Sequence, residues 1–333
     1  MEKKLRLPQA YQTKLDLLET EKAIKIVRDQ FQIGLAQALN LTRVSAPMFV
    51  LAKTGLNDNL NGSEQAVNFT SEDIGDETIE IVHSLAKWKR DALNRYGFQV
   101  GAGLYTDMNA IRKDEFLDNT HSIYVDQWDW ELAIQKEQRT LGFLKETVSK
   151  IYGVLREVQT MISIQYPALE KSLPQEITFI TSQELEDKYP NLAPEQREAK
   201  FARQFGAICI LQIGHPLQSG ISHGSRSPDY DDWNLNADII VYHELLDEAL
   251  ELSSLGIRVD AKTLLEQLGE DRAKTPYHWN ILNGKLPLTI GGGIGQSRLC
   301  MYLLEKAHIG EVQVSIWDKE TERLCAEHGI ALL

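Results

Sequence analysis

The sequence has 333 residues, of which 43% are hydrophobic and 25% charged, a balance typical of a well-packed globular protein rather than a disordered chain. Its net charge of −13 argues against a nucleic-acid partner, because a protein that grips a phosphate backbone usually presents a broad basic face. No uninterrupted apolar stretch approaches the roughly 20 residues that a membrane span requires.

The cysteine pattern and the N-terminus indicate a cellular compartment. Cys209, Cys300 and Cys325 are widely spaced and form no CxxC pair, so neither a disulfide framework nor a cysteine zinc site is predicted. The first 12 residues lack the apolar core of a signal peptide. We therefore expect a soluble protein of the reducing cytoplasm, without a membrane partner.

The first quarter of the chain predicts a helix, a strand and a loop before a second helix. Apolar residues recur at helical spacing over 8–38, and Asn40 ends this run before the extended stretch at 41–51. Residues 53–63 are rich in Gly, Asn and Asp, which predicts an irregular loop. A further strand then leads into a helix over about 85–96.

The next segment predicts a β-hairpin. Two extended stretches, at 103–112 and 121–131, are separated by the charged turn at 113–120. Because side chains alternate along a strand, Gln127 and Asp129 continue the face that begins with apolar Ile123 and Val125. These polar residues are placed to line a site, although a solvent-facing strand end is the commoner explanation for this stretch taken alone.

Helices and strands then alternate toward the C-terminus. An amphipathic pattern over 132–166 predicts one long helix or two collinear ones, and apolar strands at 176–182 and 206–214 flank a helix that begins at Pro194. Residues 214–236 form a long loop of Gly, Ser, Pro, Asp and Asn, of a kind that is usually either functional or disordered.

The last third supplies the remaining strands. Strands are predicted at 237–243 and 250–260, a helix follows Asp260, and a glycine-rich strand joins the final helix. We find no internal repeat and no clear linker. The whole chain, 1–333, is therefore predicted to be a single α+β domain with a mainly antiparallel sheet.

The glycine-rich segment TIGGGIGQSRL at 289–299 fits neither a dinucleotide fingerprint nor a phosphate loop. Glycines allow a flat ring or another backbone to approach closely, and Arg298 at the edge of this strand is suited to holding a phosphate. Close helix packing over a bare strand is the competing interpretation, and this segment alone does not decide between the two.

Two carboxylates on neighbouring predicted strands are candidates for a metal site. Asp238 and Glu251 have no basic residue spaced to neutralise them, and Mg²⁺ takes one or two carboxylates together with substrate phosphates. Surface carboxylates are the commoner explanation for such a pair. The nearby HELLD at 243–247 ends in Asp rather than His, which excludes the zinc-protease motif.

Three segments together resemble the motifs of the class II aminoacyl-tRNA synthetase catalytic fold. LNLTRVSAPMFV resembles motif 1, with Pro47 at its dimer-interface proline, AIRKDEFLDNTHSIYVDQWDWE resembles the motif 2 hairpin, and GGGIGQSRL resembles motif 3. Ser297 stands where an acidic residue usually precedes the motif 3 arginine, which argues against an ordinary synthetase. The resemblance implies a homodimer.

A closer resemblance covers the chain from about residue 10 to its end. EIVHSLAKWKR, GLYTDMNAIR, HSIYVDQWDWE, PDYDDW, LELSSLGIRVD and TIGGGIGQSRL are similar, nearly residue for residue, to the ammonia-dependent asparagine synthetase family. This implies the ATP-dependent amidation of L-aspartate by ammonia through a β-aspartyl adenylate, with release of AMP and pyrophosphate.

The resemblance also implies roles for particular residues. Arg112 would clamp the α-phosphate and Arg298 would bind the adenine and outer phosphates. The adenosine platform would comprise Gly292, Gly293 and Gly295, and Asp238 and Glu251 would hold Mg²⁺. The residues implied for aspartate are Asp58, Ser84, Lys89, Gln127, Asp129, Asp231, Ser254 and Arg258, of which Asp58 and Lys89 are also counted as catalytic, as are Arg112 and Arg298.

Some roles stay open at the level of sequence. Asp58, in the Asn-rich loop, could take a proton from ammonium, and the 214–236 loop could act as a lid or simply be disordered. The alternatives in function are a non-catalytic paralogue that binds an adenylate or a protein, and an enzyme of this fold that charges tRNA or uses another amine. The partners expected are aspartate, ATP and ammonia.

Overall fold

The computed structural model describes residues 5–58, 60 and 64–333. Residues 59 and 61–63 of the predicted 53–63 loop, and the first four residues of the N-terminal segment, lie outside the described part. The strands are β1 (Leu41–Arg43), β2 (Phe49–Leu51), β3 (Asn68–Ser71), β4 (Gly75–Ile81), β5 (Gly103–Ile111), β6 (Tyr124–Ala133), β7 (Thr178–Thr181), β8 (Ala207–Leu211), β9 (Asp231–His243), β10 (Glu248–Arg258) and β11 (Thr289–Gly295).

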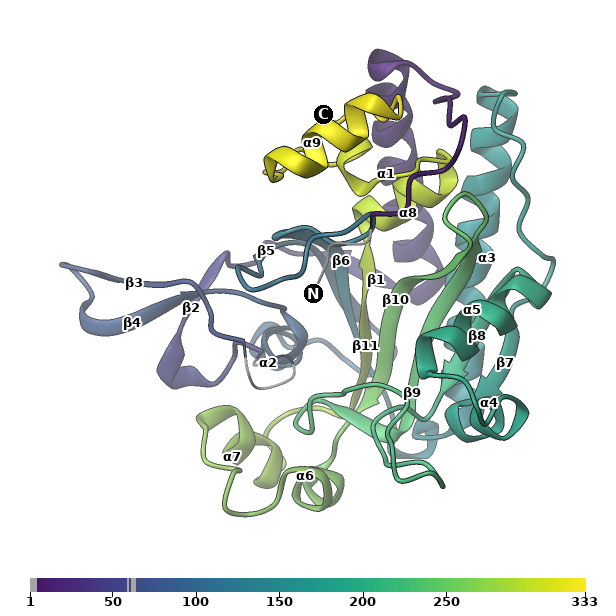
Figure 1. Ribbon diagram of the computed structural model, residues 1–333. Coiled ribbons are helices and arrows are strands. Elements are labelled where there is room, and N and C mark those ends of the chain that lie inside the picture. Colours follow the sequence, from purple (N-terminus) through teal and green to yellow (C-terminus); the bar gives the residue numbers. More distant parts are fainter. Residues whose placement is uncertain (1–4, 59, 61–63) are drawn as a thin grey trace.

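Helices lie around the body of the molecule, and β3 and β4 extend beyond them (Figure 1). The α-helices are α1 (Leu17–Leu39), α2 (Ala86–Tyr96), α3 (Leu141–Gln165), α4 (Ser182–Lys188), α5 (Pro194–Phe205), α6 (Ala261–Leu268), α7 (Pro276–Leu282), α8 (Gln296–Leu303) and α9 (Lys319–Glu327). Short 3-10 turns lie at Ala52–Thr54, Lys136–Gln138 and Ile309–Glu311. Within the described ranges, none of these helices is both long and apolar enough to cross a bilayer.

The centre of the molecule is an eight-stranded sheet with the order β1-β5-β6-β11-β10-β9-β8-β7. Only its two outer pairs, β1 with β5 and β7 with β8, are parallel, and all the inner pairs are antiparallel. The expectation of a mainly antiparallel sheet with flanking helices is therefore confirmed.

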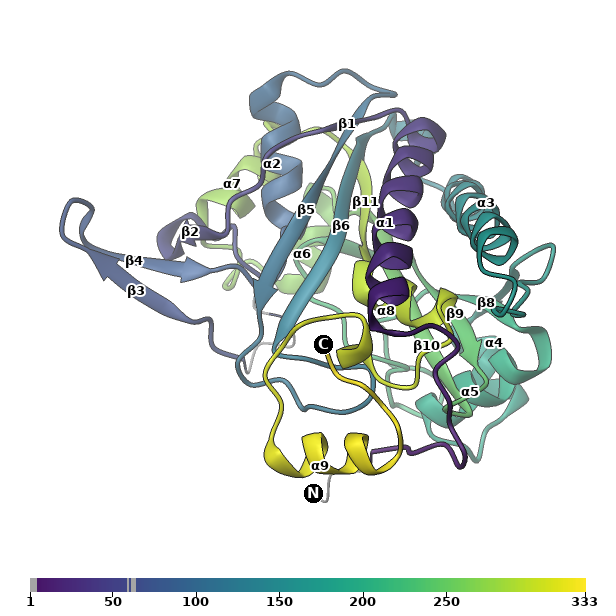
Figure 2. The same cartoon turned by 90° about the horizontal axis from the view of Figure 1, so that it is seen from above.

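One face of this sheet is closed by the main hydrophobic core. Trp128 and Trp130 of β6 point into this core, where they meet apolar side chains of α1, α3 and α8. The long helices α1 and α3 pack against each other, and the view from above places both on the same side of β5 and β6 (Figure 2).

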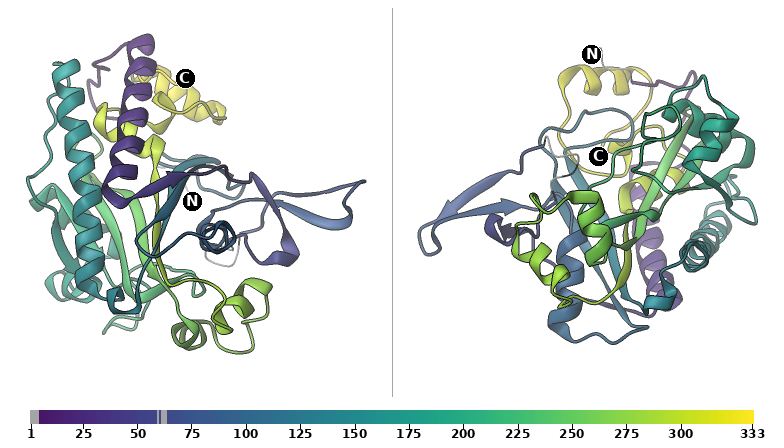
Figure 3. Two further views of the ribbon diagram at one scale, coloured as in Figure 1. Left: turned by 180° about the vertical axis from the view of Figure 1, so that it is seen from behind. Right: turned by 90° about the horizontal axis from the view of Figure 1, so that it is seen from below.

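The opposite face is only partly covered. Helix α2 packs over β5 through Leu93, Leu104 and Met108, and α5 packs over β8 and β9 through Phe201 and Ile240. Both helices also reach the middle strands, since α2 contacts β6 and β11 and α5 contacts β10, and a pocket lies on this face. The left view in Figure 3 shows α6 and α7 grouped beyond one end of the sheet.

A small three-stranded sheet, with the order β2-β4-β3, extends away from the body of the molecule (Figures 1 and 2). The stretch predicted as one strand at 41–51 is divided, since β1 joins the large sheet and β2 joins this small one. Phe49 and Phe69 pack edge to face on it, with exposed fractions of 51% and 42%.

Three predicted boundaries are wrong. The first helix begins at Leu17 rather than at residue 8, because Asp16 caps it by accepting a hydrogen bond from the Glu19 amide. The predicted 132–166 helix begins only at Leu141, since β6 continues to Ala133 and Thr140 caps α3. The predicted 214–236 loop ends early, because β9 starts at Asp231.

Candidate active site

The open face of the sheet carries a row of polar and small residues across four neighbouring strands. Asp129 of β6 lies opposite Gly293 of β11, Gly293 lies opposite Ser254 of β10, and Ser254 lies opposite Asp238 of β9. Directly opposed residues in antiparallel strands share a face. The backbone register therefore brings segments that are more than 100 residues apart in the sequence to one line.

Residues two positions away along each strand extend the same face. Gln127 lies opposite Gly295 on one side of this row, and Glu131 lies opposite Gly291 on the other. A pocket opens above these strands, and it is lined by all but one of the predicted site residues. The lining set comprises Asp58, Ser84, Lys89, Arg112, Gln127, Asp129, Asp231, Glu251, Ser254, Arg258, Gly292, Gly293, Gly295 and Arg298. The exception, Asp238, lies beside the pocket and is paired with the lining residue Arg226.

Lys89 and Asp129 form a buried ion pair on the floor of this pocket. The ammonium of Lys89 donates to Asp129 Oδ1 and, over 2.8 Å, to the carbonyl oxygen of Gly292. Burial lowers the pKa of Lys89, and the Asp129 carboxylate opposes that effect. The second oxygen of Asp129, Oδ2, is buried and has no hydrogen-bond partner in the described part of the chain, so it can accept a donor from a ligand.

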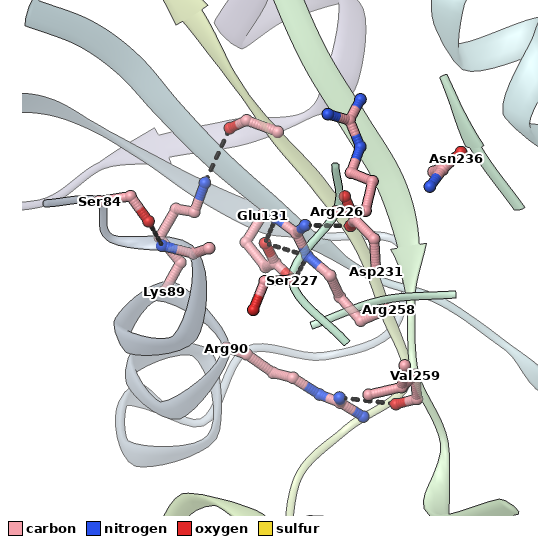
Figure 4. A network of polar contacts seen from close by, with 12 residues as sticks. Ser84, Lys89, Arg90, Glu131, Arg226, Ser227, Asp231, Asn236, Arg258 and Val259 are labelled. Carbon is pink, nitrogen blue, oxygen red and sulfur yellow. Dashed lines mark hydrogen bonds and ion pairs between the residues drawn. The ribbon is translucent and has the colours of Figure 1, made fainter. Parts of the chain in front are cut away.

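Arg258 lies between two carboxylates at the end of the same floor (Figure 4). Its Nη2 is 2.8 Å from Glu131 Oε2, and its Nη1 bonds to Asp231 Oδ1. All three side chains are at most 2% exposed. Burial alone would raise the pKa of Glu131, but the Arg258 guanidinium holds that pKa below its ordinary value. Arg258 is thus already neutralised by the protein.

The two predicted phosphate-binding arginines reach the pocket from different segments. Arg112 follows β5, and its closest polar contacts are weak: the His83 carbonyl oxygen at 3.4 Å and Glu115 Oε2 at 4.0 Å. Arg298, in the first turn of α8, donates to the carbonyl oxygens of Thr120 and Glu251 and also contacts the ring of His121. A guanidinium carries five N–H donors, so both arginines retain donors for a phosphate.

Asp58 is more firmly held than its loop composition suggested. It is buried, it accepts hydrogen bonds from the Ser84 hydroxyl at 3.1 Å and the Leu60 amide at 3.0 Å, and its carbonyl oxygen contacts the ring of His83. Asp58 and Ser84 therefore form one edge of the pocket together.

The expectation that no basic residue neutralises the Asp238–Glu251 pair is wrong. Arg226, from the segment between β8 and β9, forms an ion pair with Asp238. Burial raises the pKa of Asp238, the Arg226 guanidinium opposes that rise, and the Glu251 carboxylate adds to it. Within the described residues no group of three or more His, Cys, Asp or Glu side chains gathers as a metal site, so any metal here would rely on two carboxylates plus a substrate.

The glycines of β11 have two kinds of surroundings. A Cβ on Gly291 would lie 1.8 Å from Glu131 Oε2, and one on Gly292 would lie 2.6 Å from Cβ of Leu255 on the core side. At Gly293 the nearest atom is Oε1 of Gln127, a flexible side chain, and at Gly295 it is Cβ of Arg298 at 3.4 Å. Gly291 and Gly292 therefore serve packing, whereas Gly293 and Gly295 lie where a ligand can approach.

A second buried cluster fixes the wall of the pocket. Asp229, just before β9, accepts hydrogen bonds from Ser227 Oγ at 2.7 Å and from the ring of His278 at 2.9 Å, and it pairs with Lys87 Nζ at 2.6 Å. Lys87, Ser227, Asp229 and His278 are all buried. The lining residues on either side of Asp229 are thereby tied to α2 and α7.

Sequence reasoning missed Glu131, Arg226 and Tyr230. Glu131 could have been found, because it continues the alternation of Gln127 and Asp129 by one more step. Arg226 carried no such signal, since it lies in an irregular segment and its partner Asp238 is 12 residues away. Tyr230, whose ring lies under the Arg258 guanidinium at 5.7 Å, was equally without a local pattern.

Comparison with solved structures concerns the fold. Asparaginyl-tRNA synthetase from Pyrococcus horikoshii, complexed with asparaginyl-adenylate, matches with a TM-score of 0.64 at 15% identity, covering 88% of this chain and 68% of that one. Asparaginyl-tRNA synthetase from Entamoeba histolytica, also with asparaginyl-adenylate, matches with a TM-score of 0.63 at 13% identity, covering 89% and 66%. The predicted class II synthetase core is thus confirmed.

Comparison of sequences is more specific. The family described as aspartate-ammonia ligase matches residues 18–329. The aspartate–ammonia ligase of Clostridium perfringens is 58% identical over 334 aligned positions, which cover 99% of both chains. That of Fusobacterium nucleatum is 57% identical and covers 97% of this chain and 100% of its own length. The chain belongs to the aspartate–ammonia ligase family.

Proposed function

We propose that this pocket joins the β-carboxylate of L-aspartate to the α-phosphate of ATP, releases pyrophosphate, and transfers the aspartyl group from the resulting β-aspartyl-AMP to ammonia. The products are L-asparagine and AMP. The observation that carries this proposal is that Arg112 and Arg298, both with unused donors, line the pocket whose floor holds Lys89 and Asp129. Membership of the aspartate–ammonia ligase family supports it.

Arg112 and Arg298 would reduce the repulsion between the aspartate carboxylate and the phosphates of ATP in the first step. A carboxylate that attacks a phosphate brings two anions together, and fixed cations lower the cost of that approach. In this proposal Arg112 binds the α-phosphate, where charge accumulates during the attack, and Arg298 binds the adenine and the outer phosphates. Gly293 and Gly295 leave room for the nucleotide above β11, and Gly292 contributes its carbonyl oxygen to the position of Lys89.

The aspartate would lie on the floor between β6 and α2. The unpartnered Asp129 Oδ2 accepts the α-ammonium, and Lys89 donates to a substrate carboxylate. Gln127 and Ser254 line the same region and offer neutral hydrogen-bond donors, while the Ser84 hydroxyl, which already donates to Asp58, can accept one. The buried cluster of Asp231, Glu131 and Arg258 closes the floor, with Asp231 facing the pocket.

Asp238 and Glu251 fit a divalent cation in this scheme. They are neighbouring carboxylates next to the phosphate-binding arginine Arg298, whose Nη1 donates to the Glu251 carbonyl oxygen. Hard cations such as Mg²⁺ prefer one or two carboxylates together with phosphate oxygens. When bound, Mg²⁺ would supply positive charge to the outer phosphates and to the leaving pyrophosphate.

The second step requires neutral ammonia. Asp58 is the candidate base, because it is a buried carboxylate at the pocket edge. Its replacement by Asn should leave adenylate formation intact and abolish amidation. Loss of both steps together would refute this role.

Free ammonia is the expected nitrogen source. Cysteine-dependent glutamine hydrolysis would need a reactive thiolate, and the three cysteines are free but buried. Burial raises the pKa of Cys300 to about 12 and that of Cys325 to about 11, and it raises the pKa of Cys209 well above its usual value. Unpaired thiols also fit a cytoplasmic enzyme.

We further propose one catalytic domain that acts as a homodimer without a nucleic-acid partner. The small sheet beyond Pro47 exposes Met48, Phe49, Phe69 and Ile74, with exposed fractions between 42% and 54%. A second copy would cover such an apolar patch. The part of the 214–236 loop that precedes Arg226 is proposed to act as a lid that keeps water from the adenylate, while Ser227 and Asp229 hold the end of that loop to the wall of the pocket.

The decisive experiment measures AMP release by the purified chain. AMP should form only when aspartate, ATP and ammonium are all present, and asparagine should form in equal amount. Glutamine in place of ammonium should give no AMP above background, and added tRNA should neither be aminoacylated nor change the rate. AMP formation that depends on tRNA, or that ignores ammonium, would refute the proposal.

A further inference from the structure

Arg226 lines the pocket, but the proposed function gives it no role beside the phosphate-binding Arg112 and Arg298. It lies in the irregular segment between β8 and β9, and its side chain is only 12% exposed. Its Nη2 forms an ion pair with Asp238 Oδ1. In Figure 4 its guanidinium points away from Arg258 and toward the other end of the strands.

Three carboxylates surround this single guanidinium. Asp238 is its direct partner, and the charges of Asp231 and Glu251 also act on it. Asp231 is already paired with Arg258, so the negative charge that Arg226 neutralises is mainly that of Asp238 and Glu251. These are the two residues that the proposed function assigns to a divalent cation.

The guanidinium is not fully satisfied by this arrangement. Its Nε is buried and has no hydrogen-bond acceptor within the described part of the chain. A buried donor without an acceptor is unfavourable, and it marks a place where another group can bind. Because Arg226 itself lines the pocket, an anion in that pocket can supply the missing acceptor.

Ser227, the residue that follows Arg226, is anchored to the wall of the pocket. Ser227 is buried and donates to Asp229, which in turn is held by Lys87 and His278. A rotation of the Arg226 side chain is therefore enough to exchange Asp238 for another acceptor in the pocket.

We propose that Arg226 is an exchangeable counter-ion. Without nucleotide it neutralises the Asp238–Glu251 site, and when a divalent cation enters that site with ATP, Arg226 moves onto the outer phosphates and becomes a third phosphate-binding guanidinium. This rests on the proposed function, in particular on a metal bound by these carboxylates. The reason is electrostatic: a divalent cation on Asp238 repels the guanidinium, while the incoming phosphates attract it.

The test uses two binding measurements with opposite expected signs. Binding of Mn²⁺ alone is followed by the electron paramagnetic resonance signal of the free ion, and binding of a non-hydrolysable ATP analogue with Mg²⁺ is followed by calorimetry. In Arg226→Gln the competitor for the carboxylates is gone, so Mn²⁺ alone should bind at least about fivefold more tightly than in the wild type. The analogue should bind about thirtyfold more weakly, because its phosphates lose a charged partner.

Three further variants serve as controls for charge, for surface position and for the metal site. Arg226→Lys keeps the charge but not the planar donor pattern, so it should keep the weak Mn²⁺ affinity of the wild type while binding the analogue less tightly. Arg203→Gln changes the net charge equally on the surface of α5, where the side chain is 67% exposed, and should alter neither affinity. Glu251→Gln should reduce Mn²⁺ binding.

The possible outcomes distinguish a failure of the proposed exchange by Arg226 from a failure of the proposed metal site at Asp238 and Glu251. If Arg226→Gln binds Mn²⁺ no more tightly than Arg203→Gln while Glu251→Gln still lowers Mn²⁺ affinity, the exchange is refuted and the metal site stands. If Glu251→Gln leaves Mn²⁺ binding unchanged, the proposed metal site is refuted and the exchange falls with it. Weakening of both ligands in Arg226→Gln would also overturn the exchange, because it would show a purely supporting role.

Discussion

Gly291→Ala tests whether β11 needs a glycine at this position to leave room for the buried Glu131–Arg258 ion pair. A Cβ at this position would lie 1.8 Å from Oε2 and 2.5 Å from Cδ of Glu131, and 2.7 Å from Nη2 of Arg258, where ordinary contacts begin at 3.4 Å. The backbone of β11 is paired on both sides, with Glu131 and with Gly256, so it cannot easily retreat. The expected response is displacement of the Glu131 carboxylate from Arg258.

The cost follows from burial. Arg258 is 2% exposed, and after this displacement it would keep only Asp231 as an ionic partner. Removing one partner from a buried ion pair costs about 3–5 kcal/mol, because an uncompensated charge is left inside the protein. With an unfolding entropy of about 2.1 cal/mol/K per residue, this corresponds to a fall of about 4–7 °C in the melting temperature of a chain of this length.

Calorimetric unfolding and the KM for aspartate are the two measurements. Gly295→Ala is the matched control in the same strand, since its nearest contact is Cβ of Arg298 at 3.4 Å, and its stability should change by less than about 1 kcal/mol. In a Glu131→Ala background the cost of Gly291→Ala should shrink, because the obstructing carboxylate is absent. Equal costs in both backgrounds, or an unaffected melting temperature, would contradict this account.

Three other predictions concern catalysis, acid stability and assembly. Arg112→Ala should lower turnover by roughly 10²–10³ with little change in melting temperature, which steady-state kinetics will test; near-normal turnover would contradict its assignment. His243 is buried near Lys171, and burial lowers its pKa from 6.5 to about 3, so folding must expel the proton that the unfolded chain binds below pH 6.5. Its contribution is therefore fully present above pH 6.5 and is lost as the pH falls toward 3. His243→Leu should accordingly be less acid-sensitive than the wild type, by about 2 kcal/mol of relative stability at pH 5 in denaturant titrations, and parallel pH profiles would refute this. Phe49→Asp, in the exposed contact with Phe69, should convert a dimer to a monomer in sedimentation velocity, whereas a wild type that is already monomeric at micromolar concentration would exclude the proposed interface.

Local patterns explain what could be read from the sequence. The alternation along β6 placed Gln127 and Asp129 in the pocket and their neighbours Trp128 and Trp130 in the core, because strand geometry alone fixes which side chains share a face. Capping residues such as Asp260 were equally informative, since a helix cap is a contact between residues three positions apart.

The features that could not be predicted from the sequence depend on contacts between residues that are far apart in the chain. The pairing of Arg226 with Asp238 depends on how an irregular segment returns to the sheet, and no periodicity encodes that path. The extension of β6 to Ala133 was hidden because the apolar run beyond it suits a helix and a strand equally well. The reaction itself came from a family resemblance, because polar residues on an open sheet face specify a pocket but not its chemistry.

Three of the four residues at 87–90 are basic, and all three are buried. Lys87, Lys89 and Arg90 are each at most 3% exposed, and they bind Asp229, Asp129 and the carbonyl oxygen of Val259, respectively. A single turn of α2 thus contacts Asp129 on the floor of the pocket, the segment before β9 and the end of β10. A displacement of this turn would therefore change the contacts of all three segments at once.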